Sequence, residues 1–279
     1  MNNETKEAGV WIDGVKLQDL GIIVRLASKE PILSAPVNRT VSISNRHGAY
    51  YFGGKLTPIE FVLDCVFDRS DDYTDLKNRI TRFKRLLIDR AGNPKQVTLV
   101  FDDAINRAYR VVYDGEIDIE RVARLGIFKL PLTCFDAYAT SVIDNKDVRW
   151  GSEIIRFTND DYTYGHTGGG ASDNIVIGNE KTLHISVAGD DVRPRIELSG
   201  TGENVTIAWD GKQFGLGTID GEVIVDLANY TVIRDGQLAL DTITGDWLTM
   251  YLRNGNTDIT ITGDNMDLTF EVVFKDVFH

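Results

Sequence analysis

The chain has 279 residues, of which 42% are hydrophobic and 26% charged, the composition of a folded globular protein rather than a disordered one. No apolar run approaches the roughly 18 residues of a membrane-spanning helix, and residues 1–9 lack the apolar stretch of a secretory signal. The net charge of −12 argues against a nucleic-acid reader, which needs a basic face for phosphates. We therefore expect neither sequence-specific nucleic-acid binding nor membrane insertion.

Charge also divides the chain into two halves. Residues 1–140 carry 20 Lys and Arg against 19 Asp and Glu, a net charge of +1, whereas residues 141–279 carry 10 against 23, a net charge of −13. Such a change in surface composition indicates two domains, each large enough for its own core. We expect an N-terminal domain at 1–140, a linker near 140–151 and a C-terminal domain at 150–279.

The first half alternates with period two, which predicts strands, and begins with a hairpin. Asp13-Gly14 separates two short apolar runs and is the turn signal of a tight hairpin. Further strands are expected at 41–44, 96–101, 109–113 and 127–134, and the alternation over 114–126 predicts a two-stranded excursion from the sheet.

One segment of the first half predicts an amphipathic helix. Its apolar residues recur at spacings of three and four and share one stripe: Tyr73, Leu76, Ile80, Phe83 and Leu87. Ser70, Asp71 and Asp72 are candidate N-caps. Gly92-Asn-Pro94 is expected to stop the helix.

The second half is predicted to be strand throughout, punctuated by turns. Turn dipeptides fall between apolar alternations at short intervals: Asp210-Gly211, Asp220-Gly221, Asp235-Gly236, Asn254-Gly255 and Gly263-Asp264. About ten such strands indicate a jelly-roll β-sandwich. The fold class expected is therefore mainly β: an N-terminal β-sandwich-like domain with one α-helix, and a C-terminal jelly-roll β-sandwich.

Signals for catalysis are poor. None of the 4 His is at metal-ligand spacing with another, no nucleophile-elbow motif is present, and the adjacent carboxylate pairs cannot flank a glycosidic bond from one loop. Cys65 and Cys134 are expected to be buried, reduced thiols on strand faces. We expect no catalytic residue, metal or cofactor.

Aromatic residues of the acidic half are candidates for stacking on sugar rings: Tyr162, Tyr164, Trp209, Trp247 and Tyr230. For Trp209 and Trp247 the alternative is that they fill the core, because both stand within apolar alternation.

Two regions resemble the distal tail protein of long-tailed, non-contractile phages. The first comprises Trp11–Gly21 with its Asp-Gly turn and Asp-Leu-Gly segment, followed by Arg46–Gly53 and a strand at Ile59–Phe67. The second is the closing run Leu130–Tyr138, in which Ala137 stands where the family tends to have Pro in an Asp-Pro-Tyr motif. The second half is similar to the galectin-like sandwich of that family in pattern only.

The resemblance implies a structural virion protein: a homo-hexameric ring at the tail tip, joining the tail tube to tip and tail-associated proteins, with DNA passing through its centre. The first domain would close the ring and the second would project outward, towards a receptor-binding protein or host wall glycan. Assembly would take place in the bacterial host cytoplasm. A closed ring needs a heterologous interface, and we expect the stretch 114–126 to supply it through Ile117, Ile119 and Val122, because Ile117 and Ile119 have no evident partner inside their own domain.

Two alternatives stay open: a carbohydrate-binding module that adheres to the host cell wall, and a tail-associated glycan hydrolase.

Overall fold

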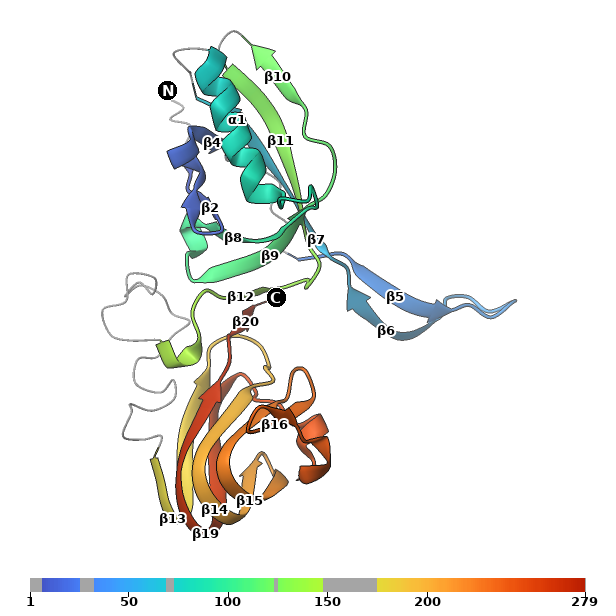
Figure 1. Ribbon diagram of the computed structural model, residues 1–279. Coiled ribbons are helices and arrows are strands. Elements are labelled where there is room, and N and C mark those ends of the chain that lie inside the picture. Colours follow the sequence, from blue (N-terminus) through green and yellow to red (C-terminus); the bar gives the residue numbers. More distant parts are fainter. Residues whose placement is uncertain (1–6, 26–32, 69–72, 123–124, 148–174, 279) are drawn as a thin grey trace. The chain divides into compact units, whose positions relative to one another are not determined.

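The computed structural model describes residues 7–25, 33–68, 73–122, 125–147 and 175–278, and it is mainly β, as the sequence predicts (Figure 1). The chain divides into two compact units, the first ending at Ala139 and the second running from Thr140 to Phe278. Among the described residues α1 (Tyr73–Leu87) is the single α-helix. None of the described helices is long and apolar enough to cross a membrane.

The first unit is built on one antiparallel sheet in which strands distant in sequence lie side by side. Its strand order is β1 (Glu7–Ala8), β4 (Ile22–Arg25), β7 (Ile59–Phe67), β11 (Leu125–Cys134), β9 (Arg107–Tyr113), β8 (Gln96–Phe101), β2 (Val10–Ile12) and β3 (Val15–Lys16), and β10 (Ile119–Val122) pairs with β11. Short 3-10 turns, η1 (Leu17–Leu20) and η2 (Asp102–Ala104), connect strands at its margin.

The predicted hairpin at Asp13-Gly14 is confirmed. Trp11 pairs with Lys16 across β2 and β3. Asp13 and Gly14 both have positive φ, 48° and 74°, the conformation that a two-residue hairpin turn of this hand requires.

The predicted helix is confirmed as well. Leu76, Phe83 and Leu87 are buried in the core of the first unit, so the apolar stripe faces the sheet (Figure 1). Phe83 lies against Phe67 and Phe128, with ring centroids 6.3 and 5.4 Å away. After the helix, the Asp89 carboxylate accepts hydrogen bonds from the backbone N–H groups of Ala91 and Asn93, which holds the predicted stop in place. The candidate caps at 70–72 lie outside the described residues.

Two stretches of the first unit differ from the expectation. Of the predicted strand at 41–44 only Val41 is in a strand, as the last residue of β5 (Pro36–Val41), and residues 42–44 are not strand. β5 pairs with β6 (Tyr50–Leu56) in a two-stranded sheet of its own. The expected excursion at 114–126 is shorter than predicted, because β10 pairs directly with the start of β11 and thereby joins the main sheet.

The second unit is one curled sheet around a large apolar core. Its strand order is β13 (Ile175–Val187), β19 (Gly255–Val273), β14 (Arg195–Trp209), β15 (Lys212–Asp226), β16 (Thr231–Arg234) and β17 (Gln237–Leu238), with β18 (Thr244–Gly245) on β15. A 3-10 turn, η4 (Leu240–Thr242), precedes β18. Long strands that alternate buried and exposed residues supply most of the core.

Some predicted turns lie inside these strands. Asp210-Gly211 does join β14 to β15, but Asp220-Gly221 lies within β15 and Gly263-Asp264 within β19, so there are fewer and longer strands than expected. The strands continue through these positions because glycine lets them bend sharply. Gly200 and Gly221 pair across β14 and β15 with φ of 138° and 126°. A β-carbon at Gly200 would lie 2.3 Å from the carbonyl oxygen of Asp267, so only glycine lets the sheet bend there.

Residues 140–147 of the expected linker belong to the second unit, and residues 148–151 lie outside the described residues. Asn145, in the short turn η3 (Asn145–Asp147), is buried, and its Nδ2 donates to the Val272 carbonyl while its Oδ1 accepts from the Phe274 N–H, both at 2.9 Å. Ser141, in β12 (Ala139–Ser141), donates its backbone N–H to the Asp276 carbonyl, shortly before β20 (Val277–Phe278). The first eight residues after the boundary are therefore fixed to the C-terminal end of the chain.

Candidate functional site

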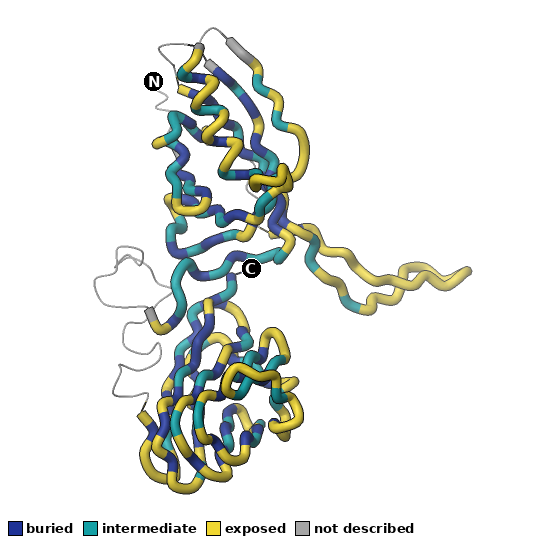
Figure 2. The backbone as a smooth tube through the Cα atoms, viewed as in Figure 1, coloured by how far each residue is buried: buried dark blue, intermediate teal, exposed yellow. Residues whose placement is uncertain are grey.

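The feature of the first unit that calls for a partner is a projecting hairpin, here called the arm (Leu33–Leu56). Figure 2 shows it as an almost continuously exposed segment that extends away from the sheet. Its strands β5 and β6 pair with each other and with no other strand in the described part of the chain. A two-stranded hairpin is at best marginally stable in water by itself, so the arm is expected to gain order from a surface that it contacts.

The arm is also unusually apolar for an exposed segment. Of the 14 large hydrophobic side chains that are exposed among the described residues, 7 lie on it: Leu33, Val37, Val41, Ile43, Tyr50, Tyr51 and Phe52. Tyr51 and Phe52 are 66% and 65% exposed. Apolar side chains concentrated on one exposed element mark an interaction surface, whereas scattered ones do not.

Strand register divides these side chains between two faces. Val41 lies opposite Tyr50 and Thr40 lies opposite Tyr51. Because successive side chains of a strand point to opposite faces, Val41, Tyr50 and Phe52 form one face. A bulge between Asn38 and Thr40 increases the local twist, and Gly53 there has φ of 88°.

Positive charge accompanies the apolar residues. The arm contains Arg39, Arg46 and Lys55 and no Asp or Glu. The Arg46 guanidinium lies over the Tyr50 ring at 4.4 Å from its centroid, a cation–π contact that covers part of the ring. The arm is therefore a basic, aromatic surface on a protein whose total charge is negative.

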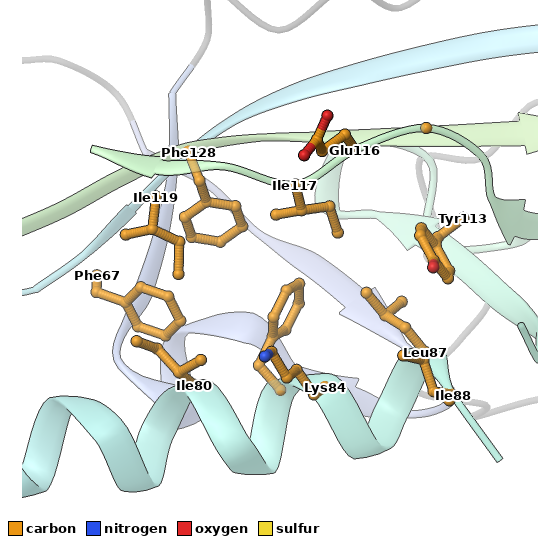
Figure 3. A pocket seen from close by; sticks show the side chains of 12 residues that line it. Phe67, Ile80, Lys84, Leu87, Ile88, Tyr113, Glu116, Ile117, Ile119 and Phe128 are labelled. Atoms are coloured by element: carbon orange, nitrogen blue, oxygen red, sulfur yellow. The ribbon is translucent and has the colours of Figure 1, made fainter. Parts of the chain in front are cut away.

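A second feature of the same unit is an apolar pocket between α1 and the segment 115–119 (Figure 3). Its volume is about 360 Å³. The sheet contributes Phe67 and Phe128, the helix contributes Ile80, Phe83 and Leu87, and Lys84 and Glu116 also line it. Figure 3 shows the side chains of Ile117 and Ile119 pointing towards the helix.

This arrangement corrects one premise drawn from the sequence. Ile117 and Ile119 are partly buried and pack against the core of their own unit, so the expectation that they have no partner inside the domain is wrong. Sequence alternation showed that they share a face but could not show that the helix covers it. Their contact with another subunit stays a prediction, and the side chain of Val122 lies outside the described residues.

The closing run of the first unit ends in a turn that excludes proline. Ala137 has φ of 59°, whereas a proline ring fixes φ near −65°. The Arg110 Nε donates to Asp136 Oδ2 at 2.8 Å, and this hydrogen bond raises the pKa of Arg110. The Cys134 thiol donates to the Tyr138 carbonyl at 3.6 Å. The turn at Ala137 therefore has a backbone conformation that the Pro of an Asp-Pro-Tyr motif could not adopt, and the hydrogen bonds of Asp136 and Tyr138 flank it.

Of the sugar-stacking candidates in the described part of the chain, Trp209 lies in the core, whereas Trp247 and Tyr230 lie beside each other. Trp209 is only 4% exposed, packs edge-on to Phe214 and donates its indole N–H to the Tyr251 carbonyl at 3.0 Å, so the core-filling interpretation is confirmed for it. Trp247 stands in a 3-10 turn, η5 (Trp247–Thr249), not in the predicted strand. It is partly buried and lies 6.5 Å from the Tyr230 ring. Tyr162 and Tyr164 lie outside the described residues.

Tyr230 is exposed, but an arginine of the same unit already contacts it. Its hydroxyl accepts a hydrogen bond from Arg193, and the Arg193 guanidinium lies 4.9 Å from its ring centroid. Arg193 also donates to the Leu248 carbonyl at 3.1 Å. A sugar ring could stack only on the face of Tyr230 that Arg193 leaves open.

Both thiols are buried, as the sequence predicts. Burial, together with the nearby Asp64 carboxylate, raises the pKa of the Cys65 thiol to about 12, and burial also raises the pKa of Cys134. Among the described residues no group of three or more His, Cys, Asp or Glu is placed to hold a metal ion.

Comparisons with known proteins agree with the resemblance drawn from the sequence. Residues 15–134 match the family of the phage tail protein RIFT-related domain. No curated protein matches the chain. The chain is similar in fold to the SPP1 Dit (gp 19.1) protein, whose crystal structure is described as a paradigm of the hub adsorption apparatus of phages that infect Gram-positive bacteria. That similarity has a TM-score of 0.69 at 17% identity and covers 98% of this chain and 100% of the other.

A weaker similarity is found to a chain of the phage p2 baseplate in its activated conformation with Sr, with a TM-score of 0.44 at 11% identity over 98% of this chain and 99% of that one. The family match confirms the resemblance of the first half to phage tail proteins over residues 15–134.

Proposed function

We propose that this chain is a structural protein of a long-tailed phage, in which six copies close a ring between the tail tube and the tail tip and DNA passes through the centre. The observation that carries the proposal is the arm, a basic and apolar hairpin without a partner strand in the described part of its own chain. The match of residues 15–134 to a phage tail domain supports a place in the tail. The number of six copies rests on the resemblance to the distal tail protein family alone.

The two units would have different tasks. The first would close the ring, since it contains both the arm and the matched residues. The second, with an excess of acidic residues, would dock tail-tip or tail-associated proteins or a receptor-binding protein. Acidic surfaces favour partners with basic patches. This role is structural rather than catalytic, located at the virion tail tip after assembly in the host cytoplasm.

The mass of the purified chain in solution tests the proposal. It is measured by size-exclusion chromatography coupled to light scattering and by native mass spectrometry, and negative-stain images show the shape of the particle. We expect six chains per particle and a ring with a central hole. The chain cut after Ala139, where the first unit ends, should still form the ring. A full-length chain that remains monomeric at all accessible concentrations would contradict the proposal.

A further inference from the structure

The acceptor for the arm can be sought on the same chain, because a closed ring of identical subunits joins two different patches of one surface. The arm does not fill the apolar pocket of its own unit: the residues that line the pocket all lie between Phe67 and Phe128. The first unit therefore has both an exposed apolar hairpin and an apolar pocket that this hairpin does not occupy.

The arm and one wall of the pocket carry opposite charges. The arm carries three basic residues and no acidic one. The segment that forms one wall of the pocket has the opposite composition: residues 114–120 contain Asp114, Glu116, Asp118 and Glu120 and no Lys or Arg. All four carboxylates are exposed, while Ile117 and Ile119 between them turn towards the helix (Figure 3). We call this segment the acidic rim.

We infer that the arm of one chain docks on the acidic rim and pocket of a second copy, with the face formed by Val41, Tyr50 and Phe52 over the pocket. This inference rests on the proposed ring and names the two surfaces that would close it. Phe52 is the anchor, because it is 65% exposed and aromatic side chains seated in pockets dominate interface energetics.

The size of the pocket fits this role. Its 360 Å³ is at the lower end of the roughly 300–1,000 Å³ of pockets that hold small molecules. One or two side chains fit such a space, whereas the strand that carries them does not and must lie across the mouth. In that position Arg39 and Arg46 come near the carboxylates of the rim, where opposite charges steer association and fix its register.

A charge-swap experiment on the full chain tests the inference. The arm variant is Arg39→Glu with Arg46→Glu, the rim variant is Glu116→Arg with Asp118→Arg, and the swap variant combines all four changes. These residues are exposed, so the fold should survive, which circular dichroism and thermal unfolding would verify. The matched control is Arg82→Glu, an exposed residue on α1. The readout is the protein concentration at which half of the chain is assembled.

We expect the arm and rim variants each to assemble at least about tenfold more weakly, the swap variant to recover most of the loss, and the control to resemble the unchanged protein. Phe52→Ala should weaken assembly without altering the thermal unfolding of the dissociated chain. In one outcome the unchanged chain assembles, the arm variant loses assembly and the swap variant fails to recover it. That result would show that the pocket is not the acceptor, without contradicting the ring. Unchanged assembly in both the arm variant and the rim variant would also show that the pocket is not the acceptor. A chain that never assembles would overturn the ring and this inference together.

Discussion

Replacing Gly200 by Ala tests the bent-strand architecture of the second unit, since that residue stands where β14 bends between β15 and β19. Its φ of 138° is a conformation that residues with a β-carbon rarely adopt. The added methyl carbon would also lie 2.3 Å from the Asp267 carbonyl oxygen and 2.6 Å from Leu268 Cα, both backbone atoms of β19. The two strands must therefore separate locally.

The expected cost follows from these two effects. The backbone conformation costs about 1–3 kcal/mol, and opening β14 from β19 sacrifices two or three ladder hydrogen bonds at about 0.5–1.5 kcal/mol each. We expect a loss of about 4 kcal/mol in the free energy of unfolding. For a unit of this size each kcal/mol lowers Tm by roughly 2–4 °C, so Tm should fall by at least about 8 °C.

The matched control is Gly211→Ala. Gly211 also has positive φ, 73°, but a β-carbon there would meet no atom within 4 Å. It should cost only the conformational part, about 1–2 kcal/mol. Differential scanning calorimetry of both variants separates the cost of the clash with β19 from the cost of the positive φ. Equal losses in the two variants would refute the account of the bend.

Three further predictions concern the thiols and the unit boundary. Cys65 and Cys134 should react with a thiol reagent only on unfolding, because they are buried and their raised pKa keeps them protonated; rapid labelling of the native protein would contradict this. The pKa of Cys65 is higher in the folded chain, about 12 against 9.0, so the unfolded chain loses this proton first and stability should fall between pH 9.0 and about 12, with a smaller fall in Cys65→Ala. Asn145→Ala leaves the Val272 carbonyl and the Phe274 N–H unpaired and should destabilise the second unit by about 2–5 kcal/mol in denaturant unfolding; no change would show that residues after Thr140 are not part of that unit.

The sequence predicted those parts of the fold that depend on local pattern. The stripe from Leu76 to Leu87 identified α1 and its buried face, and Asp13-Gly14 identified a hairpin, because helical period and turn chemistry are local properties. Alternation identified the strands of the second unit but not their lengths. Asp220-Gly221 is a turn signal in sequence, yet it lies inside β15, because β14 stays paired with it through Thr201 and Gly200.

The candidate site was predicted less well, for a physical reason. Sequence shows which residues share a face but not what covers that face, so Ile117 and Ile119 were expected to be free although α1 packs against them. The arm was missed because residues 33–56 contain strand-forming residues that look like any other strand of the sheet. One signal was available: three basic residues without an acidic one, together with Tyr50-Tyr51-Phe52, is unusual in an acidic chain.

A chain that lacks the arm shows whether the ring assembles through the arm. The arm can be replaced from Pro36 to Leu56 by a short Gly-Ser linker, because β5 and β6 pair only with each other in the described part of the chain. The mass in solution of this variant and of the full chain would be compared by native mass spectrometry at equal concentration. If the ring assembles through the arm, we expect a six-chain ring for the full chain and a folded monomer for the variant. A ring of unchanged mass without the arm would contradict it.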